Sequence, residues 1–326
     1  MRRAFLQGVA GTAAALTGAH ARAQTRPAYP ERPIRMIVPY APGGAADTTT
    51  RLVVGPMSET LGQTITIENR AGGAGTIGAA AVAQARPDGH TLLSDASAHT
   101  VNHALVRNLT FDYARDFAPV SRLGSFPLLF LIATGDGARD LQGYIASLRN
   151  RGGRIAYSSA GVGSASHLAA FLFAQRTGTE AEHVPFRGGN LGAQAVARGD
   201  TQYMLASTPA AIGLVQAGLL RVLAVAGMTR LLAIPGVPTL HEAALPGFEL
   251  AEWSGLWAPA GTPEPVLDRL AGAAASALEG LELRSRFSEL GLDPASYIGR
   301  ADFARYVVEQ RVLMTRLTAE AGIRPE

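Results

Sequence analysis

The feature that most restricts the fold is a repeated order of short apolar strand, glycine-rich loop and helix. Residues 34–40 have the composition of a strand, residues 41–46 form a Pro-Gly-Gly loop, and a helical pattern then continues until Gly62. Further strands are predicted over residues 64–67 and 91–94, separated by another glycine-rich stretch and an alanine-rich helix. This order predicts an α/β fold in which crossover helices join parallel strands.

The pattern restarts near residue 126, which predicts a second lobe. Strands are expected over residues 128–134 and 154–158, and a long apolar helix follows the glycine- and serine-rich stretch 159–166. The stretch 184–190 repeats the strand-to-loop order and includes Arg187.

Three strand-to-helix junctions, one in the first lobe and two in the second, could converge on one ligand between the lobes. Helix N-termini favour negative charge because their first N–H groups lack intrahelical partners. A guanidinium matches a carboxylate with paired donors, so Arg187 adds to the expectation of an anionic ligand.

Composition limits the class of protein. The chain has no cysteine, which excludes disulfides, thiolate metal sites and a cysteine nucleophile. All 29 basic residues are arginine; three of them, Arg2, Arg3 and Arg22, precede residue 24, and the remaining 26 equal the 26 acidic residues. We therefore expect no nucleic-acid partner, despite the sequence pI of about 9.5.

The first 23 residues have the pattern of an export signal. A basic start precedes a weakly apolar stretch, and Ala21-Arg22-Ala23 fits a cleavage site after Ala23. Residues 2–7 also resemble a twin-arginine export pattern. No later apolar run reaches about 18 residues, so we expect a soluble periplasmic protein.

Five ordered motifs, spread over the chain after residue 23, carry a family resemblance. They are Val38-Pro39-Tyr40-Ala41-Pro42-Gly43-Gly44 with Asp47, Glu68-Asn69-Arg70-Ala71-Gly72-Gly73-Ala74-Gly75, Gly163-Ser164 with His167-Leu168, Val184-Pro185-Phe186-Arg187-Gly188-Gly189, and Ala258-Pro259-Ala260-Gly261-Thr262-Pro263. Together they resemble the landmarks of the Bug family, the extracytoplasmic solute-binding proteins related to receptors of tripartite tricarboxylate transporters.

The resemblance implies a two-lobed periplasmic-binding-protein fold of type II, the Venus flytrap, with parallel-dominated sheets and an interlobe cleft. It implies lobe 1 from residues 24–125 and 248–326, and lobe 2 from residues 126–247. It further implies capture of a small carboxylic acid or amino acid, for uptake or for sensing, with no catalysis. A carboxylate ligand and a membrane transporter or sensor are the expected partners, and a monomer without metal or cofactor is expected.

The resemblance also implies ligand-binding positions. They are Ala41, Pro42, Gly43, Gly44 and Asp47 in the first lobe, and Ser158, Gly161, Gly163, Ser164, Arg187 and Ser207 in the second. Asp47 can instead cap a helix, since its charge repels a carboxylate unless the ligand brings an amine. Acids common in the family near the following helix and strand are replaced here by Ala195 and Gln202, so the family does not predict the ligand preference.

Competing chemistries have weaker support in the sequence. Residues 73–78 spell G-x-G-x-x-G, but they follow the strand too distantly for the tight turn of a dinucleotide site, and a closely packed helix start is favoured. Asp95, His99 and His103 have one-face helical spacing for a metal, yet we favour a solvated or hydrogen-bonded surface for them. A ligand contact from Ser94 or Ser97 at that strand end is also favoured over a metal. The alternative function is thus an exported oxidoreductase or metal-dependent enzyme.

Two further interpretations concern packing. Ser164 lacks the G-x-S-x-G elbow of a nucleophile, and His167, on the same helix, is interpreted as a residue that shapes the pocket or packs within the core. Trp253 and Trp257 lie in an alternating run that predicts a strand returning to the first lobe, and helical patterns after Pro265 predict helices that cover that lobe.

Overall fold

The computed structural model describes residues 29–151, 154–231, 233–291 and 298–324. The predicted export signal, residues 1–23, lies outside these ranges. Among the described residues, no helix is both long enough and apolar enough to span a membrane.

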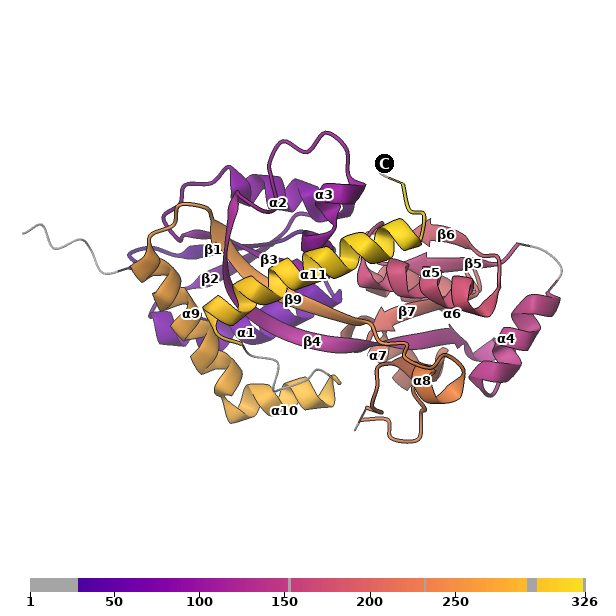
Figure 1. The fold of residues 1–326 in the computed structure, drawn as a ribbon. Helices are drawn as coiled ribbons and strands as arrows, with labels where there is room; N and C mark the ends of the chain where they lie inside the picture. The colour runs from indigo at the N-terminus through magenta and orange to yellow at the C-terminus, as the bar shows by residue number, and fades with distance from the viewer. Residues whose placement is uncertain (1–28, 152–153, 232, 292–297, 325–326) are drawn as a thin grey trace, which may run out of the picture.

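A mixed sheet of nine strands extends through both lobes (Figure 1). The strands are β1 (Ile34–Val38), β2 (Ile65–Asn69), β3 (Thr91–Ala96), β4 (Phe117–Ala133), β5 (Ala156–Ser159), β6 (Glu182–Pro185), β7 (Tyr203–Ser207), β8 (Leu220–Ala226) and β9 (Ala251–Pro259). Their order is β2-β1-β3-β9-β4-β7-β5-β6, and β8 also pairs with β4. The pairs β1–β2, β1–β3, β5–β6 and β5–β7 are parallel, as the strand-loop-helix order predicts.

The long strand β4 joins the two lobes. Its residues from Phe117 to Pro127 pair antiparallel with β9, and those from Leu128 to Ala133 pair antiparallel with β7 and β8. We call the part built on β1, β2, β3 and β9 the first lobe, and the part built on β5, β6, β7 and β8 the second lobe. The return of the chain to the first lobe through Trp253 and Trp257 is confirmed, and both indoles are buried.

Helices cover both lobes. They are α1 (Ala45–Leu61), α2 (Thr76–Ala83), α3 (Asn102–Leu105), α4 (Leu141–Asn150), α5 (Ala165–Thr177), α6 (Gly189–Arg198), α7 (Thr208–Gln216), α8 (Leu240–Ala243), α9 (Glu264–Glu279), α10 (Leu281–Glu289) and α11 (Arg300–Glu320). The predicted stop of α1 is confirmed, because Gly62 adopts the left-handed conformation at φ 70° that favours glycine.

The last helix differs from its prediction. Phe303 and Val307 of α11 pack in the first lobe, but Met314 belongs to the core of the second lobe, and Figure 1 shows α11 crossing the molecule. The C-terminal helix therefore bridges the lobes rather than covering one of them.

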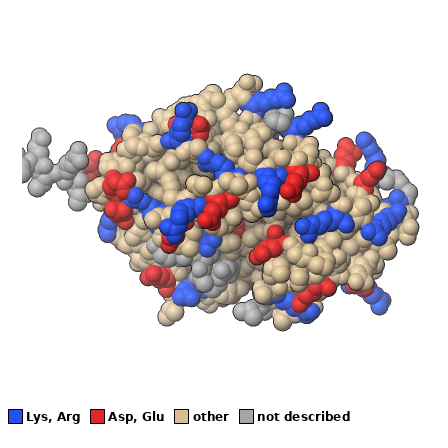
Figure 2. Space-filling view, in the orientation of Figure 1, with Lys and Arg blue, Asp and Glu red and all other residues tan. Residues whose placement is uncertain are grey.

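Each lobe has its own apolar core. Ile34, Met57 and Leu270 lie in the core between the first-lobe sheet, α1 and α9, whereas Phe130 and Phe173 lie in that of the second lobe. On the face shown in Figure 2, acidic and basic side chains are interspersed.

Candidate functional site: a pocket between the lobes

A small pocket lies where the two lobes meet. The residues that line it are Tyr40, Gly44, Ala45, Ala46, Ala96, Ala98, Ala160, Ser164, Ser166, Gly188, Gly189, Met204, Ala206, Ser207 and Glu252. They include the starts of α1, α5, α6 and α7. The three predicted strand-to-helix junctions thus reach one pocket, and the β7-to-α7 junction adds a fourth.

The start of α1 presents backbone donors to this pocket. Gly44 is the N-cap residue and has no side-chain cap, so the N–H groups of the first helical residues, Ala45 and Ala46, have no partner within the helix. These N–H groups and the helix dipole make the position favourable for an anion.

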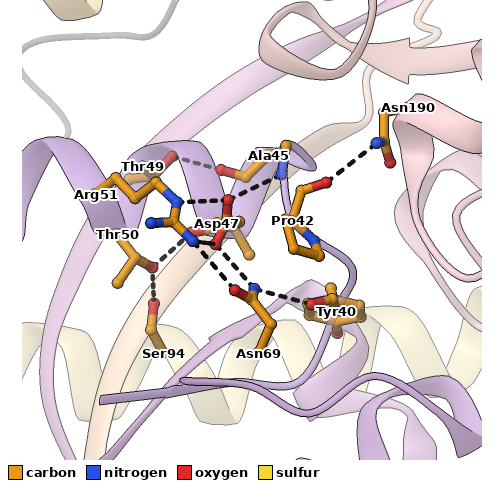
Figure 3. Close-up of polar contacts among 12 residues, drawn as sticks. Tyr40, Pro42, Ala45, Asp47, Thr49, Thr50, Arg51, Asn69, Ser94 and Asn190 are labelled. Atoms are coloured by element: carbon orange, nitrogen blue, oxygen red, sulfur yellow. Dashed lines mark hydrogen bonds and ion pairs between the residues drawn. The ribbon is translucent and has the colours of Figure 1, made fainter. Parts of the chain in front are cut away.

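Asp47 holds the first-lobe loop in place instead of capping α1 (Figure 3). Its carboxylate accepts hydrogen bonds from the Gly43 N–H at 2.8 Å, from Arg51 Nε at 2.8 Å and from Asn69 Nδ2 at 2.8 Å. Burial acts to raise the pKa of Asp47, but these hydrogen bonds outweigh it and hold the pKa below its ordinary value. The N-cap prediction for Asp47 is wrong because Gly44 takes that position, and Asp47 does not line the pocket.

The start of α5 is ordered by its own serines. The Ser164 hydroxyl is the N-cap of α5: it accepts from the His167 N–H and donates to the Gly161 carbonyl at 2.7 Å. Ser166 accepts from the Ala160 N–H at 2.8 Å and lies 3.0 Å from the Ser164 hydroxyl. Both hydroxyls line the pocket, at fixed positions.

The starts of α6 and α7 complete the second-lobe side. A Cβ added at Gly189 would lie 3.0 Å from the Ala210 Cβ, so glycine permits the close approach of α6 to α7. Gly188, the N-cap of α6, and Ser207, the N-cap of α7, provide no side-chain cap, and Ser207 instead hydrogen-bonds Glu252.

Four predicted site residues lie behind the pocket wall. The Ser94 hydroxyl lies 2.7 Å from that of Thr50, and the Ser158 hydroxyl donates to the Gly192 carbonyl. A Cβ added at Gly163 would lie 2.4 Å from Leu105 Cδ1, so the glycine packs against α3. The fourth, His167, accepts from the Gly163 N–H and stacks on His183, with ring centroids 3.6 Å apart. Whether any of the four contacts a ligand stays a prediction.

The stacked histidines are both held neutral. Burial lowers the pKa of His167 to about 3, with a contribution from His183, and burial lowers the pKa of His183 to about 4. His183 Nε2 also lies 2.6 Å from the Ser159 hydroxyl. The pair packs at the α5 start without lining the pocket, and whether His167 shapes the pocket stays a prediction.

The remaining predicted residues lie at the mouth of the cleft. Gly161 and Arg187 line an adjoining outer pocket of about 370 Å³. The loop of Ala41, Pro42 and Gly43 meets the second lobe, because the Ala41 N–H donates to the Arg187 carbonyl and Asn190 Nδ2 donates to the Pro42 carbonyl (Figure 3). This loop therefore joins the two lobes across the mouth.

The inner pocket is nearly closed. The space that the centre of a water molecule can occupy is about 20 Å³, which is room for about one water molecule. The lobes must move apart before an organic acid of several carbon atoms can enter.

The residues of the competing chemistries are arranged differently from a cofactor or metal site. Gly73–Gly75 form a separate turn before α2, and a Cβ at Gly78 would lie 2.7 Å from the Pro39 Cβ, so the glycines serve close packing. Asp95 and His99 pair at 3.1 Å, but His103 lies on a different helix and is exposed. Among the described residues, no group of three or more potential ligands could hold a metal ion.

Comparison with known proteins identifies the family. The family model described as tripartite tricarboxylate transporter family receptor matches residues 49–323. The chain belongs to this family. BugT of Bordetella pertussis is 31% identical over 268 residues, which are 82% of this chain and 82% of that protein.

Solved structures of the receptor family share the fold. MatC of Rhodopseudomonas palustris, with bound malate, is 33% identical with a TM-score of 0.82, covering 89% of this chain and 99% of MatC. An R. palustris protein with adipate is 30% identical with a TM-score of 0.88, covering 91% of this chain and 100% of that one. The resemblance to the Bug family and the two-lobed periplasmic-binding-protein fold are confirmed.

Sequence reasoning missed several pocket residues of this family member. Ser166, Gly189 and the first residues of α1 lie within two residues of predicted positions, so a two-residue extension of each motif would have found them. Glu252 was missed entirely, although an acid inside the buried, alternating run of β9 is a signal for a special role.

Proposed function

We propose that this protein is an extracytoplasmic solute-binding protein that closes its two lobes on a small carboxylate. The observation that carries the proposal is the convergence of four helix starts on one buried interlobe pocket. Backbone N–H groups and the dipoles of several helices together stabilise an anion without a basic side chain. The ligands of two relatives, malate and adipate, support a carboxylate as the solute.

Export and partners follow from this role. We propose that residues 1–23 direct export to the periplasm and are removed after Ala23, and that the closed protein acts as a monomer on a membrane transporter or a membrane sensor.

The proposed lobe boundary near residue 126 is supported by β4, whose pairing changes between Pro127 and Leu128. Arg187 and the loop of Ala41 and Pro42 are proposed to close the mouth over the ligand.

A thermal-shift screen tests the proposal, because a ligand that binds only the folded state raises its melting temperature. The panel contains mono-, di- and tricarboxylates, amino acids and nicotinamide dinucleotides. We expect a carboxylate to raise the melting temperature. A shift with a dinucleotide alone would favour an exported oxidoreductase instead.

Gly44 offers a matched pair of variants. Its φ of −75° suits any residue, and an added Cβ would lie 3.6 Å from the Ala41 carbonyl oxygen, an ordinary contact. Aspartate and asparagine both cap a helix, but only aspartate brings a negative charge. We expect Gly44→Asp to weaken carboxylate binding by more than about 100-fold and Gly44→Asn to weaken it far less. Equal effects of the two variants would contradict an anion site at this helix start.

A further inference from the structure

Glu252 is a buried carboxyl group within the wall of the proposed ligand pocket. It lies on β9, is 7% exposed, and hydrogen-bonds the side chain of Ser207. The described residues around it in the pocket are mostly small and apolar, and among them Tyr40 is the one other titratable group. The Tyr40 hydroxyl donates to Asp95 at 2.8 Å, so it is already engaged.

The charged groups on the elements packed against β9 have other partners. These groups are Asp47 and Arg51 on α1, Asp95 on β3, His99 on the 3-10 helix Ser97–Thr100, Arg122 on β4, and His167 and Arg176 on α5, besides Glu59, which is exposed in the last turn of α1. Asp47 pairs with Arg51, and Asp95 with His99. The guanidinium of Arg122 lies over Tyr306 and that of Arg176 over Phe248, while His167 is neutral and bonded to the Gly163 N–H. α11 packs against Trp253, which points to the opposite side of the strand from Glu252.

Glu252 therefore lacks a cationic partner among the described side chains that form its surroundings. Burial raises its pKa to about 7, although the hydrogen bond from Ser207 acts to lower it. Above neutral pH the pocket then combines helix starts, which favour an anion, with a carboxylate, which favours a cation.

We propose that Glu252 selects, among carboxylates, those that also carry an ammonium group, so that the ligand is an amino acid. This inference rests on the proposed function and narrows its substrate class. The ligand's carboxylate meets the helix starts, and its ammonium group meets Glu252. A plain dicarboxylate binds only when Glu252 is protonated, and its binding takes up a proton. Malate and adipate, the ligands of the two relatives, carry no ammonium group, so the proposal sets this pocket apart from theirs.

The test measures affinities by titration calorimetry for matched pairs that differ by the ammonium group: aspartate and succinate, glutamate and glutarate, 2-aminoadipate and adipate. At pH 8.5 a plain diacid should bind about 30-fold more weakly than at pH 6, because the protonated fraction of Glu252 is about 30-fold smaller at pH 8.5. The matching amino acid should instead bind about ten-fold more tightly at pH 8.5 than at pH 6, because Glu252 must lose its proton to pair with the ammonium group. At pH 8.5 it should bind at least ten-fold tighter than the diacid. Glu252→Gln should remove the pH dependence and reduce the preference at least ten-fold, whereas the exposed Glu249→Gln, three residues earlier, should change neither.

Proton uptake by the unaltered protein gives a second readout that needs no variant. Titrations in buffers of different ionisation enthalpy should show about one proton taken up per plain diacid at pH 8.5 and none per amino acid. Plain diacids that bind as tightly as amino acids at pH 8.5, without proton uptake, would overturn the role of Glu252 and leave the carboxylate receptor standing. Absence of any carboxylate binding would overturn the proposed function and this inference with it.

Discussion

The stability of the closed, ligand-free protein should depend on pH through Glu252. The folded-state pKa of about 7 lies above the ordinary value of 4.5, so between these values the folded state holds more protons than the unfolded state. Stability from this group is therefore fully present below about pH 4.5 and is lost as the pH rises through 7. At about 1.4 kcal/mol per pH unit the total is roughly 3 kcal/mol, of which about 2.5 kcal/mol falls between pH 5 and pH 8.5.

The assay is urea unfolding at a series of pH values, followed by the fluorescence of the buried Trp253 and Trp257. Relative to the unaltered protein, Glu252→Gln should gain about 2.5 kcal/mol in the free energy of unfolding from pH 5 to pH 8.5. His167 and His183 have lowered pKa values, so their contribution is lost as the pH falls below 6.5, but it cancels in this difference. Glu249→Gln serves as the control, since Glu249 is exposed. A difference that stays constant with pH would refute the assignment of a buried, uncompensated acid at Glu252.

Three further variants test the parts around the pocket. Asp47→Ala should lower the free energy of unfolding, measured in urea, by about 2 kcal/mol, because the buried carboxylate accepts hydrogen bonds from three donors. The loss is not larger because one donor, Arg51, is half exposed, and Asp47→Asn should cost less. Ser164→Ala should cost about 1 kcal/mol by removing the N-cap of α5, and an Asn at this position should recover part of it, both measured by thermal unfolding. Asn190→Ala removes the hydrogen bond to the Pro42 carbonyl across the mouth and should favour opening of the lobes. Small-angle scattering should then show a radius of gyration larger than that of the unaltered protein without ligand, and equal to it with saturating ligand.

The fold was predictable where the local sequence alone sets the element. Gly62 ends α1 in the left-handed conformation, and the apolar run of β1 is buried at four of its five residues. The crossing part of β4 was not predicted. It contains Pro119 and Pro127, and its register shifts between Pro119 and Ser121, so the alternation that marks a strand is broken.

The site was predictable only in part, because the sequence marks loops before helices but not the direction of side chains at strand ends. Glycine-rich loops before helices indicate backbone N–H groups that can bind an anion, and Gly44, Ser164 and Ser207 from the predicted loops do line the pocket. Ser94 and Ser158 are polar residues at strand ends as well, but their hydroxyls turn toward α1 and α6. The direction of a side chain at a strand end depends on which helix packs beside it, and the sequence does not show that.

The position of Glu252 on a crossing strand links ligand charge to closure. β9 pairs with β3 in the first lobe and with β4, which continues into the second, while Ser207, the partner of Glu252, starts a second-lobe helix. In an open cleft this carboxyl is hydrated, so its ionisation costs little free energy, whereas closure removes water and raises its pKa. Closing therefore requires either a proton or a ligand cation at Glu252, in addition to an anion at the helix starts. A ligand that supplies both charges satisfies the helix starts and Glu252 together, so above neutral pH it stabilises the closed state more than a plain diacid does.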